Sequence, residues 1–262
     1  MSVSCKKLKT LLAVLVFFLL TCTVSSVSAE VKTAPNKIPY PADYNTSDGA
    51  SGVEGRGDHK KTPYFAHPGI YNLKSGGSLT ILEKFKTYQQ TTEWSCGNAS
   101  ALMVANYFGL EGQRELDIAR IMGTNSEIGG TTTEQMTRYF KSIGYEVRSS
   151  LEVSEEDMIP DGAAFKDWVI KHLTNRRPIM VEWLDWHAHW QVVIGYDTMG
   201  TDDVIEDDVL ILADPYDVGD QLQDGYYIFP AERFFYMWHD IRYEGEDRLR
   251  NQQWVISYPS KR

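Results

Sequence analysis

The apolar residues of this chain change their spacing at Pro178, and this change is the feature that most constrains the fold. Before Pro178, apolar side chains recur every three or four residues, which is typical of helices. The expected helices cover 97–107, 115–122, 165–173 and the stretch between the capping residues 131–134 and Gly144. After Pro178, short runs of β-branched and aromatic residues predict strands at 179–183, 190–196, 209–212, 226–229 and 254–258, with a helix at 232–237. Helices followed by an antiparallel sheet indicate an α+β fold.

The N-terminus has the pattern of a secretory signal peptide. Three lysines within residues 6–9 precede the apolar stretch 11–20, and small residues end at Ala29. This order predicts cleavage after Ala29, so residues 1–29 are interpreted as a signal peptide of a secreted or cell-envelope protein. A membrane anchor is disfavoured because a span needs about 20 apolar residues. A lipoprotein anchored at Cys22 is a minor alternative.

Residues 30–79 form a polar N-terminal extension or linker, rich in Gly, Pro, Asp, Lys and Ser, and we expect part of it to be disordered. The apolar pairs 64–65 and 70–71 are the places where it can dock. The folded domain is expected at 80–262. The chain has 36 acidic and 26 basic residues and a formal net charge of −10, which disfavours nucleic acids and anionic membrane surfaces as partners.

Cleavage after Ala29 would leave Cys96 as the single cysteine of the mature chain. A lone cysteine in an exported protein either pairs between chains, lies buried and inert, or reacts. Cys96 directly precedes a predicted helix, whose N-terminus favours the thiolate form. Gly97 allows another backbone or a substrate to approach closely and is a candidate substrate-binding residue, and Trp94 is a candidate wall of the substrate groove. Cys96 is therefore a candidate nucleophile.

A thiolate nucleophile needs a base, and the base needs a group that orients it. His189 opens the predicted strand 190–196, with His187 two residues earlier as a rival. Asp214 follows the next strand and can accept a hydrogen bond from an imidazole on the neighbouring strand. Taken singly, His189 fits a solvated loop histidine better than a catalytic base, and Asp214 fits an Asp-Pro turn better than an orienting carboxylate. Their combination with Cys96 favours catalysis.

The segments QQTTEWSCGNASALMVANYFG, HWQVVIGYD and ADP together resemble the bacteriocin-processing (double-glycine) peptidase family of papain-like cysteine peptidases. The resemblance implies Cys96 as the nucleophile, His189 as general base and acid, Asp214 as its orienter and Gln90 as the oxyanion donor. It also implies a papain-like fold, with the nucleophile at the N-terminus of a central helix packed on an antiparallel sheet. The sequence departs from the family pattern at Asn98, where proline is common, and at Ala188, where glycine is common.

The sequence therefore predicts an exported cysteine peptidase that acts on a peptide or protein substrate as a monomer and without a cofactor. The acidic run 202–208 is interpreted as a solvated loop, because it lacks the ordered ligands of a calcium loop, and no metal site is expected. Two alternatives stay open: a thiol acyltransferase that uses the same triad, and a catalytically idle papain-like module that binds peptides or the cell surface.

Overall fold

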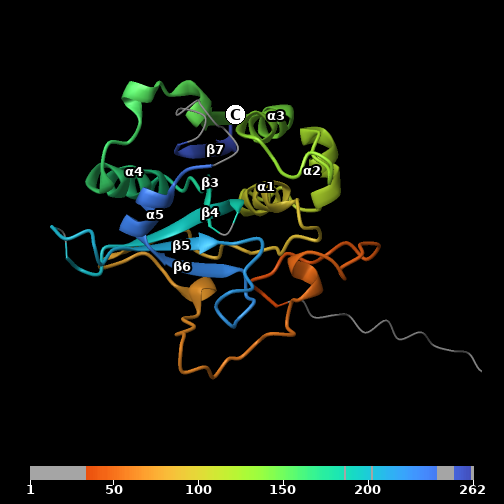
Figure 1. The fold of residues 1–262 in the computed structure, drawn as a ribbon, viewed down its shortest axis with the longest axis horizontal. Helices are drawn as coiled ribbons and strands as arrows, with labels where there is room; N and C mark the ends of the chain where they lie inside the picture. Colours follow the sequence, from red (N-terminus) through yellow and green to blue (C-terminus); the bar gives the residue numbers. More distant parts are fainter. Residues whose placement is uncertain (1–33, 186, 202, 241–250, 261–262) are drawn as a thin grey trace, which may run out of the picture. The chain divides into compact units, whose positions relative to one another are not determined.

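The computed structural model describes residues 34–185, 187–201, 203–240 and 251–260 (Figure 1). Its α-helices are α1 (Cys96–Tyr107), α2 (Glu115–Met122), α3 (Thr133–Ser142), α4 (Gly162–Thr174) and α5 (Ala231–Met237). Its strands are β1 (Leu79–Ile81), β2 (Tyr145–Ser149), β3 (Ile179–Leu184), β4 (Ala188–Asp197), β5 (Val209–Ala213), β6 (Tyr226–Pro230) and β7 (Gln253–Pro259). The α+β class and the order of helices before the main strands agree with the sequence-based expectation.

The strands form one antiparallel sheet in the order β2-β7-β3-β4-β5-β6, and β1 pairs with residues 195–197 of β4, beyond the stretch of β4 that pairs with β3. β3 and β4 lie in the middle of this order and are buried along almost their whole length, so they form the floor of the core. Because neighbouring side chains on a strand point to opposite faces, Trp190 faces away from the side of His189 and its partner Trp183. Trp183 packs against Phe234 of α5, so α5 covers this face of the sheet.

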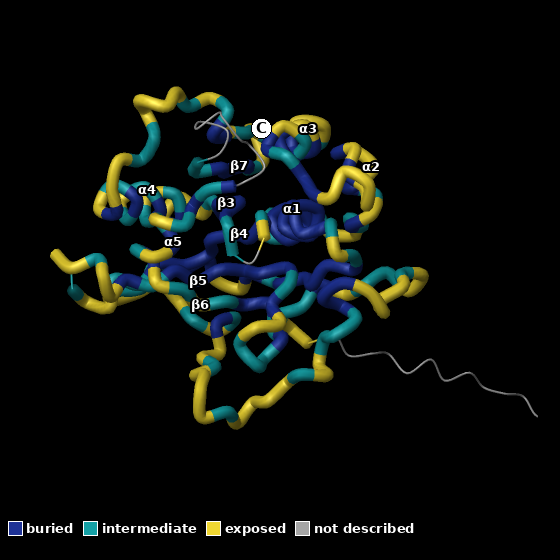
Figure 2. Tube along the Cα trace, viewed as in Figure 1, coloured by how far each residue is buried: buried dark blue, intermediate teal, exposed yellow. Residues whose placement is uncertain are grey.

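α1 is the central helix, and ten of its twelve residues are buried (Figure 2). Small residues at Ala99 and Ser100 allow close approach to the sheet, and the Ser100 hydroxyl donates to the carbonyl of Trp190 in β4 at 3.2 Å. α3 begins with the expected cap: the Thr132 side chain accepts from the amide of Gln135, whose side chain accepts from the amide of Thr132. The Ser100 contact holds α1 against β4, and the cap fixes the start of α3.

The extension expected at 30–79 is not a free linker where it is described. The described residues from 34 onward belong to one compact unit, in which Ile38, Ala50 and Ile70 are buried. Docking at 70–71 is therefore correct, but docking at 64–65 is wrong, since Tyr64 is 78% exposed and Phe65 46% exposed. These three buried apolar residues are far apart in a segment of polar composition, so they form no pattern in the sequence.

The remaining differences are local. The sequence analysis missed β1 and β2, because β1 has only three residues and β2 alternates half-buried with exposed side chains. The predicted signal peptide, 1–29, lies outside the described residues. Within the described part, no helix is both long enough and apolar enough to cross a bilayer.

Candidate active site

Cys96 is the first residue of α1 and is 8% exposed. Within the described residues it forms no disulfide, and it lies where the amide groups of the first helical turn have no partner within the helix. The partial positive charge of this helix end stabilises a thiolate. The loop 88–95 leads directly into Cys96, so the conformation of this loop sets the position of the Cys96 sulfur.

His189 is the second residue of β4, and Asp214 directly follows β5. The antiparallel pairing of β4 with β5 sets Val192 opposite Ala213, which carries both side chains to the same end of the two strands. The Nε2 atom of His189 lies 2.7 Å from Oδ1 of Asp214. This contact leaves Nδ1 as the ring nitrogen available to Cys96.

The electrostatics of this pair favour a protonated imidazole. Burial lowers the pKa of His189, but the charge and hydrogen bond of Asp214, and then the hydrogen bond and charge of Cys96, raise it more, to about 10. For Asp214, burial raises the pKa of the carboxyl, yet His189 and the amide of Tyr216 lower it below its ordinary value. The buried imidazole is therefore held as an imidazolium between the Asp214 carboxylate and the Cys96 side chain.

Gln90 is 1% exposed and lines the same cleft as Cys96. Its Nε2 donates to the carbonyl of Thr92 at 2.7 Å, which leaves a second Nε2 hydrogen for another acceptor. Gln89 points elsewhere: its Nε2 donates to the carbonyls of Tyr216 and Asp217, each at 3.2 Å. The two chemically identical neighbours thus have different surroundings.

The cleft has a volume of about 300 Å³. It is lined by Gln90, Glu93, Trp94, Cys96, Gly129, Gly130, Thr131, Glu182, His187, Ala188, His189 and Trp190. Trp94 is therefore where the sequence predicted it. Gly97 is not among the lining residues, because its α-carbon faces Thr131: a Cβ there would lie 2.5 Å from the Thr131 Cβ. Gly97 therefore gives room to the side chain of Thr131, and its contact with a substrate stays a prediction.

Glu115 of α2 holds the loop before Cys96 and was not predicted from the sequence. It is fully buried, and its carboxylate accepts from the hydroxyls of Ser95 and Thr91, both at 2.6 Å, and of Tyr88 at 3.1 Å, and from the Thr91 amide at 3.1 Å. Burial raises the pKa of this carboxyl. An acidic residue in the first turn of a helix resembles an ordinary surface charge, so the sequence offers no signal for this role.

Two further residues that were not predicted from the sequence lie beside the Asp214 carboxylate. The amide of Tyr216 donates to Oδ1 of Asp214 at 2.8 Å, and the nearby Gln191 side chain helps to lower the pKa of this carboxyl. Gln191 is in turn fixed by Trp183, whose Nε1 donates to its Oε1 at 2.6 Å. Gln191 lies two residues after His189 on the same strand face, which is the one sequence signal for its role.

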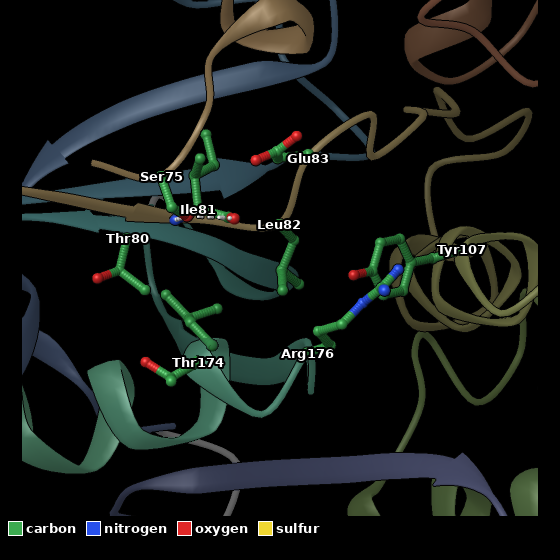
Figure 3. A pocket seen from close by; sticks show the side chains of 9 residues that line it. Ser75, Thr80, Ile81, Leu82, Glu83, Tyr107, Thr174 and Arg176 are labelled. Carbon is green, nitrogen blue, oxygen red and sulfur yellow. Dashed lines mark hydrogen bonds between the residues drawn. The ribbon is translucent and has the colours of Figure 1, made fainter.

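A larger cavity, of about 480 Å³, lies elsewhere in the molecule (Figure 3). In Figure 3 the side chain of Arg176 points toward Tyr107, and this contact raises the pKa of the guanidinium. The other lining residues are Ser75, Thr80, Ile81, Leu82, Glu83, Leu173 and Thr174. None of the lining residues is a cysteine or histidine, so the smaller cleft is the candidate active site.

Comparison with known proteins identifies the family of the chain. The model of the Peptidase_C39 like family matches residues 82–246. Among solved structures, the chain is similar to the peptidase domain of Streptococcus ComA, a bi-functional ABC transporter involved in a quorum sensing pathway. The identity is 20% and the TM-score 0.46, over 67% of this chain and 99% of that one. No curated protein matches the chain significantly. The family match spans the helix that begins at Cys96 and the strands that carry His189 and Asp214, and the chain is therefore a cysteine peptidase of the Peptidase_C39 like family.

Proposed function

We propose that the protein is an exported peptidase that cleaves peptide bonds through a triad of Cys96, His189 and Asp214, with Gln90 as an oxyanion donor. The observation that carries the proposal is the position of one buried imidazole, which contacts both the Cys96 thiol and the Asp214 carboxylate. Such an arrangement activates a nucleophile and also supplies a proton to the leaving group.

The chemistry follows from these contacts. The Cys96 thiolate attacks the carbonyl carbon of the substrate, and the carbonyl oxygen becomes an oxyanion. The Gln90 amide and the backbone N–H of Cys96 donate to that oxyanion. His189 gives its proton to the leaving amine, and the C–N bond breaks to leave a thioester on Cys96. A water molecule then loses a proton to His189 and attacks the thioester, which releases the acid and the free thiolate.

Export is supported by the sequence pattern of residues 1–29, and peptide or protein substrates are what a peptidase family acts on. We propose cleavage after Ala29, so the mature protein starts at Glu30. N-terminal sequencing of protein collected from the culture medium or cell envelope tests this: Glu30 is expected, and an intact Met1 or a lipid-modified Cys22 would contradict it.

Hydrolysis of a peptide library tests the activity. We expect the mature protein to cleave it and Cys96→Ala to be inactive with an unchanged melting temperature, since the thiol is replaced by a smaller group. Undiminished hydrolysis by Cys96→Ala would refute the mechanism. Products joined to an added amine, in place of free acids, would identify a transferase, and no turnover by the wild type would identify a binding module.

The role of Gln90 is tested separately. Gln90→Ala removes one oxyanion donor, which typically lowers the rate about 10²–10³-fold. Alkylation of Cys96 by iodoacetamide builds no oxyanion, so its rate should stay close to that of the wild type. The isosteric Gln90→Glu should lose as much hydrolysis, because its carboxylate cannot donate. If Gln90→Ala also abolishes alkylation, Gln90 supports the loop and not the transition state.

A further inference from the structure

Residues 34–54 of the extension are hydrogen-bonded to the segment 87–90, which ends at Gln90. The Ile38 amide donates to the carbonyl of Thr87 at 2.8 Å, and the Thr87 amide donates to the carbonyl of Asn36 at 2.7 Å. The Ser51 amide donates to the carbonyl of Gln90 itself at 3.0 Å. The extension therefore fixes the backbone of the segment 87–90.

Lys37 connects three segments of the chain. Its Nζ donates to Oε1 of Gln89 at 2.6 Å and to the carbonyl of Gln223 at 3.0 Å, and it lies 3.3 Å from Oε1 of Glu54. The Lys37 side chain is only 11% exposed. An ammonium group has three hydrogens to donate, and three oxygens surround this one. Lys37 is therefore a fixed link and not a solvated surface charge.

Gln89 carries this link to the loop that follows Asp214. The Gln89 Nε2 donates to two carbonyls of that loop, at Tyr216 and Asp217. The backbone N–H of Gln90 donates to a third carbonyl, that of Pro215, at 2.8 Å. The Tyr40 hydroxyl lies 2.9 Å from the Gln89 carbonyl. The same set of contacts thus holds the segment with the oxyanion donor against the loop that follows the triad carboxylate.

The extension supports the site without closing it. None of the residues that line the cleft comes from 34–89. Close packing continues at Gly49, where an added Cβ would lie 2.7 Å from the Thr92 amide nitrogen and 2.9 Å from the Gln90 carbonyl oxygen. Such a segment differs from an inhibitory pro-segment, which has to occupy the cleft.

We propose that residues 34–54 are a positioning element of the peptidase and that Lys37 is its central positioning residue, which sets Gln90 relative to Cys96. The proposal rests on the role of Gln90 given under the proposed function. It assigns the extension to the catalytic unit, so the extension is required for turnover in the mature enzyme. Lys37 acts through Gln89 and Gln90 and does not itself contact the substrate.

A double-mutant cycle in the full-length mature protein tests the proposal. Lys37→Met keeps the length of the side chain and removes its donors. We expect kcat to fall about 10–100-fold, because small displacements of a catalytic group cost this much, while KM and the rate of Cys96 alkylation stay unchanged. In a Gln90→Ala background, Lys37→Met should lower kcat no further, since the group that it positions is already absent. Lys60→Met, a change at an exposed lysine of the same extension, is the matched control and should leave kcat unchanged.

Three results would overturn the inference. The first is a wild-type kcat for Lys37→Met. The second is an equal loss of kcat with and without Gln90, which would make Lys37 an independent structural residue. The third is a wild-type kcat for Gln90→Ala, which would refute the proposed role of Gln90 itself and is thus distinguishable. If Lys37→Met does not fold, Tyr40→Phe enters the same cycle, because it removes one hydroxyl next to Gln89 and no charge.

Discussion

Gly97→Ala tests how the start of α1 is fixed against the opposite wall of the cleft. The new Cβ would lie 2.5 Å from the Cβ, 2.6 Å from the Oγ1 and 3.0 Å from the Cγ2 of Thr131. Ordinary carbon–carbon contacts are about 3.5–4.0 Å, so Thr131 or the helix start has to move by about 1 Å. Thr131 is held in place, because its carbonyl accepts from Nε1 of Trp190 at 2.7 Å.

The size of the effect is the difference between two terms. Alanine in place of glycine stabilises a helix by up to about 1 kcal/mol, while overpacking a buried site costs about 1–3 kcal/mol. We expect a net loss of about 1–2 kcal/mol in the free energy of unfolding, measured by urea denaturation. Because Cys96 is the adjacent residue, a shift of about 1 Å should lower kcat up to about 100-fold.

Thr131→Gly provides the compensating change, since it removes all three atoms in the way. Gly97→Ala combined with Thr131→Gly should be more stable than the sum of the two single losses, and it should recover part of the lost kcat. The reasoning would be refuted if Gly97→Ala alone were as stable and as active as the wild type, or if the two losses were simply additive.

Two other predictions concern the buried carboxylates. Asp214→Asn should move the alkaline limb of the kcat/KM profile to lower pH. Turnover needs a protonated His189, so activity is lost as the pH rises through the pKa of that imidazole. When the Asp214 charge is removed, burial lowers this pKa. An alkaline limb at the same pH would contradict the assignment. Glu115→Ala should lower the free energy of unfolding by at least about 3 kcal/mol, since four donors of the loop before Cys96 lose their acceptor. A loss below about 1 kcal/mol in urea denaturation would contradict this.

Local patterns made the main elements predictable. Among the described residues, apolar spacing located the five α-helices, and the apolar runs after Pro178 located the strands β3 to β7. Both patterns work because the spacing of apolar residues reports which face of an element is buried. The three residues proposed as the triad could also be predicted from the sequence, since Cys96 begins a helix, His189 opens a strand and Asp214 directly follows the next strand. Their pairing follows from the adjacency of two antiparallel strands.

The supporting residues could not be predicted, because their roles depend on contacts between distant segments. Glu115 and Lys37 look like surface charges in the sequence. Only the structure shows that both hydrogen-bond to the segment 87–95, Lys37 at Gln89 and Glu115 at residues 88, 91 and 95. Gly97 illustrates the same limit: its small size was correctly noted, but the neighbour that requires it, Thr131, is 34 residues away in the chain, in the loop before α3.

The pH dependence of Cys96 alkylation is the most direct test of the central claim, which is a preformed ion pair between Cys96 and His189. Iodoacetamide should modify the wild-type thiol at nearly the same rate from about pH 6 to 9, because the imidazolium holds it as a thiolate well below the ordinary cysteine pKa of about 8.5. In His189→Ala, the rate should be low at pH 6 and rise toward an ordinary cysteine profile. A wild-type rate that rises tenfold per pH unit up to about 8.5, or a profile that His189→Ala leaves unchanged, would contradict the account.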